Sequence, residues 1–178
     1  MEHVFSLEPF SSTEESPKLK IAGNIVRYSN LLTITYAVLG DLKEISILAL
    51  SEAPERKNEL WRETCFEFFL GIQNSPRYWE FNLSPTGDWN VYSFDSYRQG
   101  MKEEVAFTLL PFSVQHQADS LTLALNIDLE QIIPTEQAID IAITAVIKQQ
   151  NDSISYWALA HKGTEADFHL RDSFIIGS

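Results

Sequence analysis

The chain has 178 residues, 44% of them hydrophobic, and its 25 acidic and 13 basic residues give a formal net charge of −12. This length suffices for one sizeable hydrophobic core, so we expect a single domain over residues 1–178. The negative charge argues against nucleic acid and anionic membranes as partners, because both require a basic surface.

The only cysteine, Cys65, excludes a disulfide bond within the chain. No basic segment followed by an apolar stretch opens the sequence, and no apolar run approaches membrane-spanning length. We therefore expect a cytoplasmic protein without a membrane partner. No feature of the sequence indicates an oligomeric state.

The N-terminal third predicts short strands separated by polar turns. Its apolar residues tend to alternate with polar ones, which is the period of a strand with one buried face. A charged segment that contains a proline then leads to Trp61, and such a loop is a plausible rim for a site. In chain order the expected elements are an apolar segment at Val4–Leu7, a polar loop from Pro9 to Pro17, a hairpin of Lys18–Tyr28 and Leu31–Leu39, a strand at Glu44–Ala49, and a helical turn or loop at Glu52–Leu60.

The stretch from Trp61 to Phe94 predicts three consecutive antiparallel strands. Three runs rich in aromatic and β-branched residues are separated by clusters of turn residues at 71–77 and 84–88. The runs are Trp61–Leu70, Tyr78–Leu83 and Trp89–Phe94.

The alternation of side chains along these strands predicts two different faces. Successive side chains point to opposite sides of a strand, so Glu67 lies opposite Phe66 and Phe68. By the same count Glu80 and Asn82 share one face, and the large apolar residues of their strand share the other. One face therefore needs a second layer of structure, and the other carries carboxylates, amides and aromatic rings.

The second half of the chain again predicts many short strands. Pro111 interrupts one of them, which indicates an edge strand or a bulge. The expected elements are a connection at Tyr97–Met101, the interrupted strand at Val105–Val114, a strand at Leu121–Ile127, a helical turn at Leu129–Ile133, a buried strand at Ala138–Ile147, and strands at Ile154–Leu159 and Phe174–Ile176. The fold class is therefore all-β, a single antiparallel β-sandwich with short helical turns.

Glu67 and Glu80 are the first candidates for a functional site. Like charges on neighbouring strands are destabilising, so such a pair needs a cation, a hydrogen-bonding ligand or a raised pKa. Arg98, Lys148 and His169 are candidate partners within the chain. The alternative is that both carboxylates simply point to water.

The tryptophans divide into two groups. Trp61 directly follows a charged segment, which favours an exposed aromatic platform. Trp79, Trp89 and Trp157 lie within predicted strands and are expected to pack in the core or against a sheet.

The sequence leaves three other kinds of chemistry open. His161, Asp167 and His169 could bind a transition metal in a metal-dependent enzyme, although such residues more often fix a loop by hydrogen bonds. Haem would find possible axial ligands in Met101, His161 and His169, but no Cys-x-x-Cys-His motif is present. The Glu67 and Glu80 pair also suggests glycoside hydrolysis, which depends on a separation that sequence does not reveal. We expect no cofactor and no bound metal.

Two motif regions resemble a known family. Trp61-Arg-Glu-Thr-Cys-Phe-Glu67 with Tyr78-Trp-Glu-Phe-Asn-Leu-Ser-Pro85, and Tyr156-Trp-Ala-Leu-Ala-His161 with Ala166-Asp-Phe-His169, are similar to DOMON-like domains. The similarity is to the bacterial branch related to family 9 carbohydrate-binding modules. The resemblance implies a jelly-roll-like sandwich with a ligand cleft on its concave sheet, and binding of a sugar or haem without catalysis.

The resemblance also implies roles for individual residues. Trp61 and Phe168 would stack on the two sides of a sugar ring, and Glu67 and Asn82 would hydrogen-bond its hydroxyl groups. Glu80 stands where the sugar-binding modules carry arginine, and Phe168 stands where they carry a second tryptophan. The predicted ligand site comprises Trp61, Glu67, Glu80, Asn82, Arg98, Phe168 and His169.

The predicted function is non-catalytic binding of a small polar ligand, a carbohydrate. The alternatives are the metal-dependent enzyme, haem binding, and a protein-interaction module whose concave face receives a partner.

Overall fold

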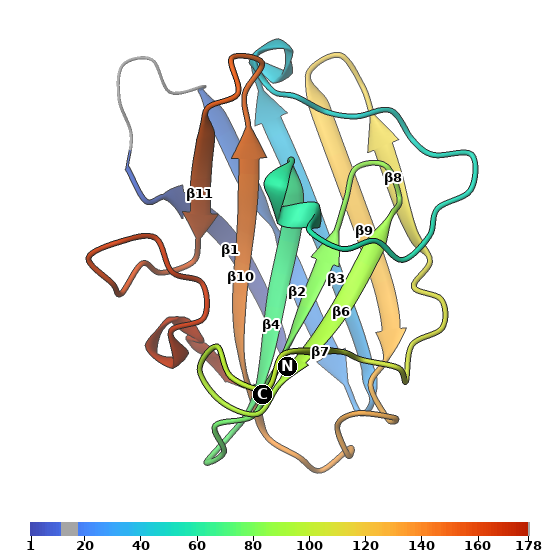
Figure 1. Cartoon of the computed structure of the whole chain (residues 1–178), viewed down its shortest axis with the longest axis vertical. Helices are drawn as coiled ribbons and strands as arrows, with labels where there is room; N and C mark the ends of the chain where they lie inside the picture. The colour runs from blue at the N-terminus through green and yellow to red at the C-terminus, as the bar shows by residue number, and fades with distance from the viewer. Residues whose placement is uncertain (12–17, 178) are drawn as a thin grey trace.

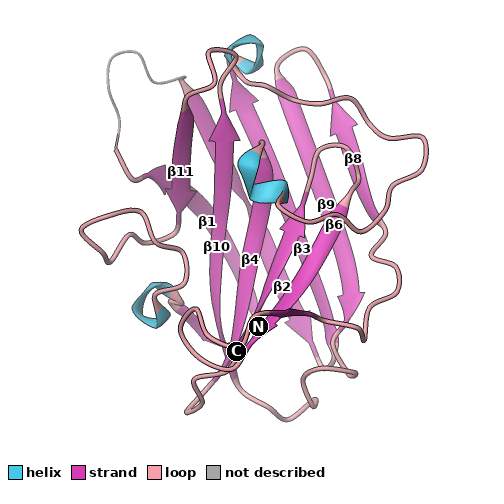
Figure 2. Ribbon diagram, viewed as in Figure 1, coloured by secondary structure: helices cyan, strands magenta, loops and turns pink. Residues whose placement is uncertain are grey.

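The computed structural model describes residues 1–11 and 18–177, and it consists almost entirely of antiparallel strands (Figures 1 and 2). Sheet A contains β1 (Glu2–Pro9), β2 (Leu19–Tyr28), β3 (Leu31–Gly40), β8 (Phe112–His116) and β9 (Ser120–Asp128). Sheet B contains β4 (Cys65–Ile72), β5 (Tyr78–Leu83), β6 (Trp89–Phe94), β7 (Lys102–Glu103), β10 (Ile139–Lys148), β11 (Ile154–Ala158) and β12 (Ile176–Gly177). Three short 3₁₀ helices are η1 (Leu42–Glu44), η2 (Leu60–Arg62) and η3 (Arg171–Ser173).

The two sheets form the layers of a sandwich and share one strand. Figure 1 shows β2 and β3 of sheet A behind β10 and β4 of sheet B. Strand β1 pairs with β2 along most of its length, and its last two residues, Glu8 and Pro9, pair with β11. The strand order is therefore continuous, β7-β6-β5-β4-β10-β11-β1-β2-β3-β9-β8, with β12 beside β10. The predicted all-β antiparallel sandwich is confirmed.

The main core fills the space between the sheets. Phe66, Phe68 and Leu70 of β4 belong to it, as the alternation predicted, and so do the apolar residues of β5. The Phe68 and Phe81 rings stack with centroids 4.4 Å apart. The buried Tyr36 hydroxyl donates to the Glu67 backbone oxygen at 2.6 Å, which ties sheet A to sheet B at the residue whose side chain points away from the core.

Four predicted strand boundaries are wrong. The strand predicted at Phe174–Ile176 begins only at Ile176, because Phe174 follows η3 and packs against Phe69 and Tyr78. Residues 46–49 of the predicted Glu44–Ala49 strand lie outside the sheets. Only Ile45 forms a β-bridge, and the Leu48 side chain is exposed. The strand predicted from Val105 begins at Phe112, directly after Pro111, which cannot donate a ladder hydrogen bond. The run predicted from Trp61 starts as η2 and becomes strand only at Cys65.

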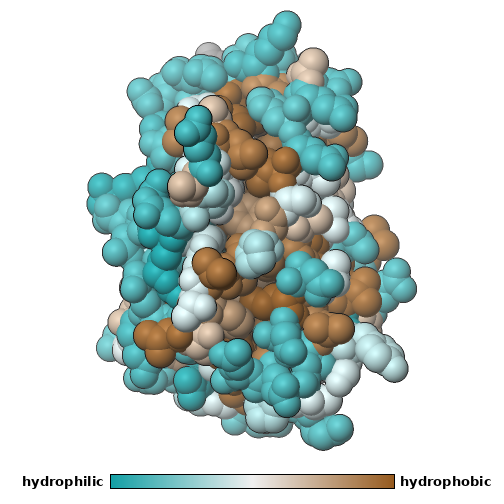
Figure 3. All heavy atoms as spheres, turned by 90° about the vertical axis from the view of Figure 1, so that its right-hand side faces the viewer, coloured by the Kyte–Doolittle hydropathy of each residue, from teal (hydrophilic) through white to brown (hydrophobic). Residues whose placement is uncertain are grey.

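Other features agree with the expected pattern or add to it. Leu129 closes the predicted turn by accepting hydrogen bonds from the Ile132 and Ile133 amides. Residues 12–17 of the predicted polar loop lie outside the described residues. Among the residues described, no helix has the length and apolar character needed to cross a membrane. Figure 3, which faces the side that carries β8, shows hydrophobic residues gathered between hydrophilic margins.

Candidate functional site

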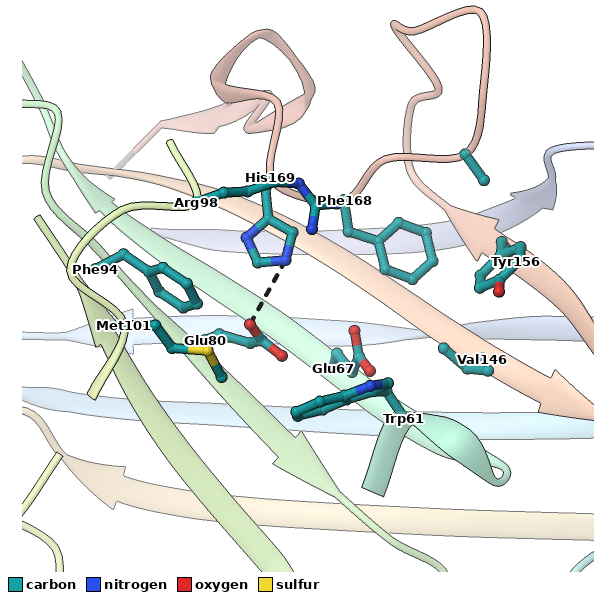
Figure 4. Close-up of a pocket in the computed structure, with 11 residues that line it drawn as sticks. Trp61, Glu67, Glu80, Phe94, Arg98, Met101, Val146, Tyr156, Phe168 and His169 are labelled. Carbon is teal, nitrogen blue, oxygen red and sulfur yellow. Dashed lines mark ion pairs between the residues drawn. The ribbon is translucent and has the colours of Figure 1, made fainter. Parts of the chain in front are cut away.

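A pocket of about 420 Å³ opens on the face of sheet B that is turned away from the main core. This volume is within the range of small-molecule sites, roughly 300–1,000 Å³. The face is the one on which alternation placed Glu67 and Glu80. The pocket is lined by Trp61, Glu67, Glu80, Phe94, Arg98, Met101, Val146, Tyr156, Ala166, Phe168 and His169 (Figure 4).

Strand register brings the two carboxyl groups together. Glu67 of β4 pairs with Asn82 of β5, and Phe69 pairs with Glu80, so the two glutamates are diagonal neighbours on one face. Both point into the pocket in Figure 4, and their residues are only 3% and 4% exposed. The alternative that they simply point to water is therefore wrong.

Burial dominates the electrostatics of these carboxyl groups. It raises the pKa of Glu67 well above its usual range, and the charge of Glu80 raises it further. Burial raises the pKa of Glu80 to about 7, against the hydrogen bond from Asn82 and the charge of Arg98. The Oε1 atom of Glu67 is buried and has no hydrogen-bond partner among the described residues. Such an atom is costly unless a ligand or a proton satisfies it.

His169 is held as a neutral side chain beside Glu80. The Tyr78 hydroxyl accepts the Arg98 backbone N–H at 3.2 Å and lies 2.8 Å from His169 Nδ1, so we assign its proton to that contact. The remaining ring proton then lies on Nε2, which is 3.8 Å from Glu80 Oε2. Burial, with the charge of Arg98, lowers the pKa of His169 to about 4. With a pKa of about 4 the His169 ring is neutral at pH 7, so its contact with Glu80 is a polar contact between an imidazole and a carboxyl group.

Asp167 connects two loops at the rim of the pocket. Its carboxylate accepts hydrogen bonds from the Arg98 guanidinium at 2.8 Å, the Tyr97 hydroxyl at 2.5 Å and the His169 backbone N–H at 3.0 Å. Arg98 has a positive φ of 52°, and this turn carries its side chain across the upper part of the pocket in Figure 4. The connection predicted at Tyr97–Met101 therefore contributes a fixed side chain to the site.

Aromatic side chains form the walls. Trp61 comes from η2 and its indole packs edge-on against Tyr92, with centroids 5.8 Å apart. Phe168 packs in the same manner against Tyr156 at 5.9 Å. Figure 4 shows Glu67 between the Trp61 ring and the Phe168 ring. Both predicted aromatic residues thus line the pocket, although their role toward a ligand stays a prediction.

Comparison with known proteins adds the fold relationship. No protein-family model matches the chain, and no curated protein matches its sequence. A candidate carbohydrate-binding protein from Bacteroides uniformis, known from its crystal structure, superposes with a TM-score of 0.70 at 12% identity, over 95% of this chain and 84% of that one. A family 9 carbohydrate-binding module from Caldicellulosiruptor kristjanssonii, solved in complex with cellotriose, superposes with a TM-score of 0.53 at 10% identity, over 88% and 72%.

At these identities the likeness shows a shared fold. The fold resembles that of family 9 carbohydrate-binding modules, as the two motif regions implied. Membership of the DOMON-like domains stays a prediction.

The structure places two predicted polar residues away from the pocket surface. Asn82 is fully buried beneath the lining and donates to Glu80 Oε1 at 2.9 Å, so it orients a carboxyl group. Lys148 does not neutralise the glutamates, because its ammonium group binds Glu63 at 2.8 Å and Asp152 at 3.2 Å.

Sequence reasoning missed several lining residues. Val146 of β10 pairs with Cys65 of β4 and with Tyr156 of β11, which puts all three on the face of Glu67. The sequence contains this alternation, but the order of strands across sheet B does not follow from it. Phe94, Met101 and Ala166 also line the pocket.

The predicted metal ligands are held apart by other contacts. His161 Nε2 lies 2.8 Å from the Glu8 backbone oxygen, whereas Asp167 and His169 belong to the rim network described above. Within residues 1–11 and 18–177, no group of three or more His, Cys, Asp or Glu side chains could hold a metal ion. The proposed ligand set for a metal-dependent enzyme is therefore wrong. Of the haem ligand candidates, Met101 and His169 line the pocket and His161 does not.

We expect the purified protein to contain no stoichiometric transition metal, because His161, Asp167 and His169 already serve the loops that carry them. Elemental analysis should find less than one zinc or iron per chain, and a chelator should leave the thermal midpoint unchanged. A stoichiometric metal that a His161→Ala substitution removes would contradict this expectation.

Proposed function

We propose that the pocket on sheet B binds a carbohydrate without transforming it. The observation that carries the proposal is the buried, unpartnered Glu67 Oε1 between two aromatic walls. A sugar ring has apolar C–H faces that suit aromatic surfaces and a rim of hydroxyl groups that needs hydrogen-bond partners. The fold shared with a cellotriose-bound family 9 module supports the same assignment.

Each lining residue takes a role that its contacts allow. Trp61 and Phe168 pack against the ring, and Glu67 accepts hydrogen bonds from hydroxyl groups through Oε1. Glu80 offers a second acceptor, which Asn82 orients from below. His169 presents its Nε2 proton toward the same space, as the Tyr78 contact requires.

The fold relationship supports binding over hydrolysis, because the two structural relatives named above are described as carbohydrate-binding proteins. Glycoside hydrolysis by two carboxyl groups needs one that is ionised and one that is protonated. Burial raises the pKa of Glu67 well above its usual range and that of Glu80 to about 7. These shifts suit a hydrolytic pair as well as a ligand-binding pair, so the proposal of binding is based on the fold and on the aromatic walls.

A panel of mono- and disaccharides should identify binding with a Kd of roughly millimolar to micromolar, because a few hydrogen bonds and two stacking walls offset the ordering cost only modestly. Trp61→Ala should weaken the binding at least about tenfold, since about 1.4 kcal/mol of contact suffices for that factor. Calorimetry and tryptophan fluorescence provide the measurement.

The matched control is Tyr28→Ala, because Tyr28 is an aromatic residue with 80% exposure that does not line the pocket. This variant should bind like the parent protein. The absence of sugar binding at millimolar concentration, or full affinity in Trp61→Ala, would refute the site as assigned.

A further inference from the structure

The pocket holds two buried carboxyl groups, and no cation of the described residues forms an ion pair with Glu67. Lys148 is engaged by Glu63 and Asp152, and the Arg98 guanidinium binds Asp167 at the rim. His169 is neutral at physiological pH because its pKa is lowered to about 4 by burial.

The two glutamates also differ in how well their oxygen atoms are satisfied. Glu80 Oε1 accepts a hydrogen bond from Asn82, and Glu80 Oε2 has the His169 ring 3.8 Å away. Glu67 Oε1 has no partner although its residue is only 3% exposed. In Figure 4 the Glu67 and Glu80 carboxyl groups point into one space, with Trp61 beside it. A group that fills this space contacts both carboxyls at once.

We propose that the preferred ligand is an amino sugar, whose ammonium group donates hydrogen bonds to Glu67 Oε1 and to Glu80 while its ring packs against Trp61 and Phe168. This inference rests on the proposed carbohydrate site and names the class of sugar that fits it.

An ammonium group fits this space better than a hydroxyl group for three reasons. It has three donors and a positive charge, so it satisfies both carboxyls and favours the ionised forms that burial otherwise disfavours. Hydrogen bonds that involve a charged group are stronger than hydrogen bonds between two neutral groups. A cation beside the Trp61 face gains further from the ring quadrupole.

Three ligands that differ at one position test the inference. Glucosamine carries the ammonium group, N-acetylglucosamine keeps the nitrogen without its charge, and glucose has a hydroxyl group there. At about pH 7 an amine with a pKa of about 8 is largely charged. Calorimetry at moderate salt should find glucosamine bound at least about tenfold more tightly than either neutral sugar.

Two variants distinguish binding in the pocket from a general electrostatic attraction between a cation and a chain with net charge −12. Glu67→Gln should abolish the preference for glucosamine, and Glu130→Gln, which removes an exposed carboxylate outside the pocket, should leave it unchanged. The ligand ranking of the unmodified protein needs no variant, so it stands even if Glu67→Gln folds poorly.

The outcomes distinguish this inference from the proposed function. Glucose or N-acetylglucosamine bound as tightly as glucosamine would overturn the amino-sugar assignment and leave the carbohydrate site intact. Failure of all three sugars and of the wider saccharide panel at millimolar concentration would overturn both. A glucosamine preference that survives Glu67→Gln, or that is lost in Glu130→Gln, would overturn the role of Glu67.

Discussion

Replacing Phe68 with alanine should lower the free energy of unfolding by about 3–5 kcal/mol. Phe68 is fully buried between the sheets, and its ring lies nearly parallel to Phe81, with an angle of 10° and centroids 4.4 Å apart. Removing the ring leaves a cavity that two paired sheets cannot close without breaking their ladders. The loss is a large part of the stability of a typical domain, about 5–15 kcal/mol.

Urea denaturation followed by tryptophan fluorescence measures this loss. Tyr28→Ala again serves as the control. The Tyr28 ring is exposed, so its removal should change the free energy of unfolding by less than about 0.5 kcal/mol. A Phe68→Ala protein whose stability falls by less than about 1 kcal/mol would show that this face of β4 is not a packed core.

The second large effect is a pair of opposite pH dependences. The pKa of Glu80 is about 7 in the fold against a usual 4.5, so the unfolded chain ionises first and stability declines as pH rises from 4.5 to 7. Burial shifts the pKa of Glu67 in the same direction. The pKa of His169 is about 4 against a usual 6.5, so stability declines as pH falls from 6.5 to 4. The pKa shift of Glu80 and that of His169 each correspond to a change of about 3 kcal/mol in the free energy of unfolding.

In the parent protein the two pH dependences of stability oppose each other. Substitutions that remove the glutamates or the histidine should reveal each dependence by itself. His169→Gln removes the acid-side loss, so stability should rise on acidification from pH 7 to 4.5. The double substitution Glu67→Gln/Glu80→Gln removes the other slope, so its stability should fall over the acidification from pH 6.5 to 4.5. Denaturation midpoints across this range provide the test. Parallel pH profiles in the two variants would contradict the burial of these groups.

Much of the fold could be predicted because a strand has a side-chain period of two. That period assigned Phe68 to the core and Glu67 to the opposite face without knowledge of the neighbouring strands. It failed at Glu44–Ala49, where Leu48 looks like a strand residue but stays exposed. Local pattern does not reveal whether an apolar side chain will find a partner.

The candidate site could be predicted where local motifs identified its residues, and not where its residues are brought together by the order of distant strands. Trp61, Glu67, Glu80 and the Phe168–His169 pair came from motifs and all line the pocket. Val146 and Tyr156 were missed because β10 lies between β4 and β11, an order that loop-connected neighbours do not suggest. Lys148 was misassigned for a related reason, since Glu63 and Asp152 compete for it at distances that sequence does not show.

The position of β10 inside sheet B sets an order of events in biosynthesis. Strand β4 needs β10 as its second neighbour, yet residues 139–148 leave the ribosome long after residues 65–72. Until then, one edge of β4 presents a row of unpaired backbone amides and carbonyls, a template for pairing with other chains. The nascent protein therefore depends on its C-terminal strands to complete sheet B, and folding is governed by contacts between distant parts of the chain.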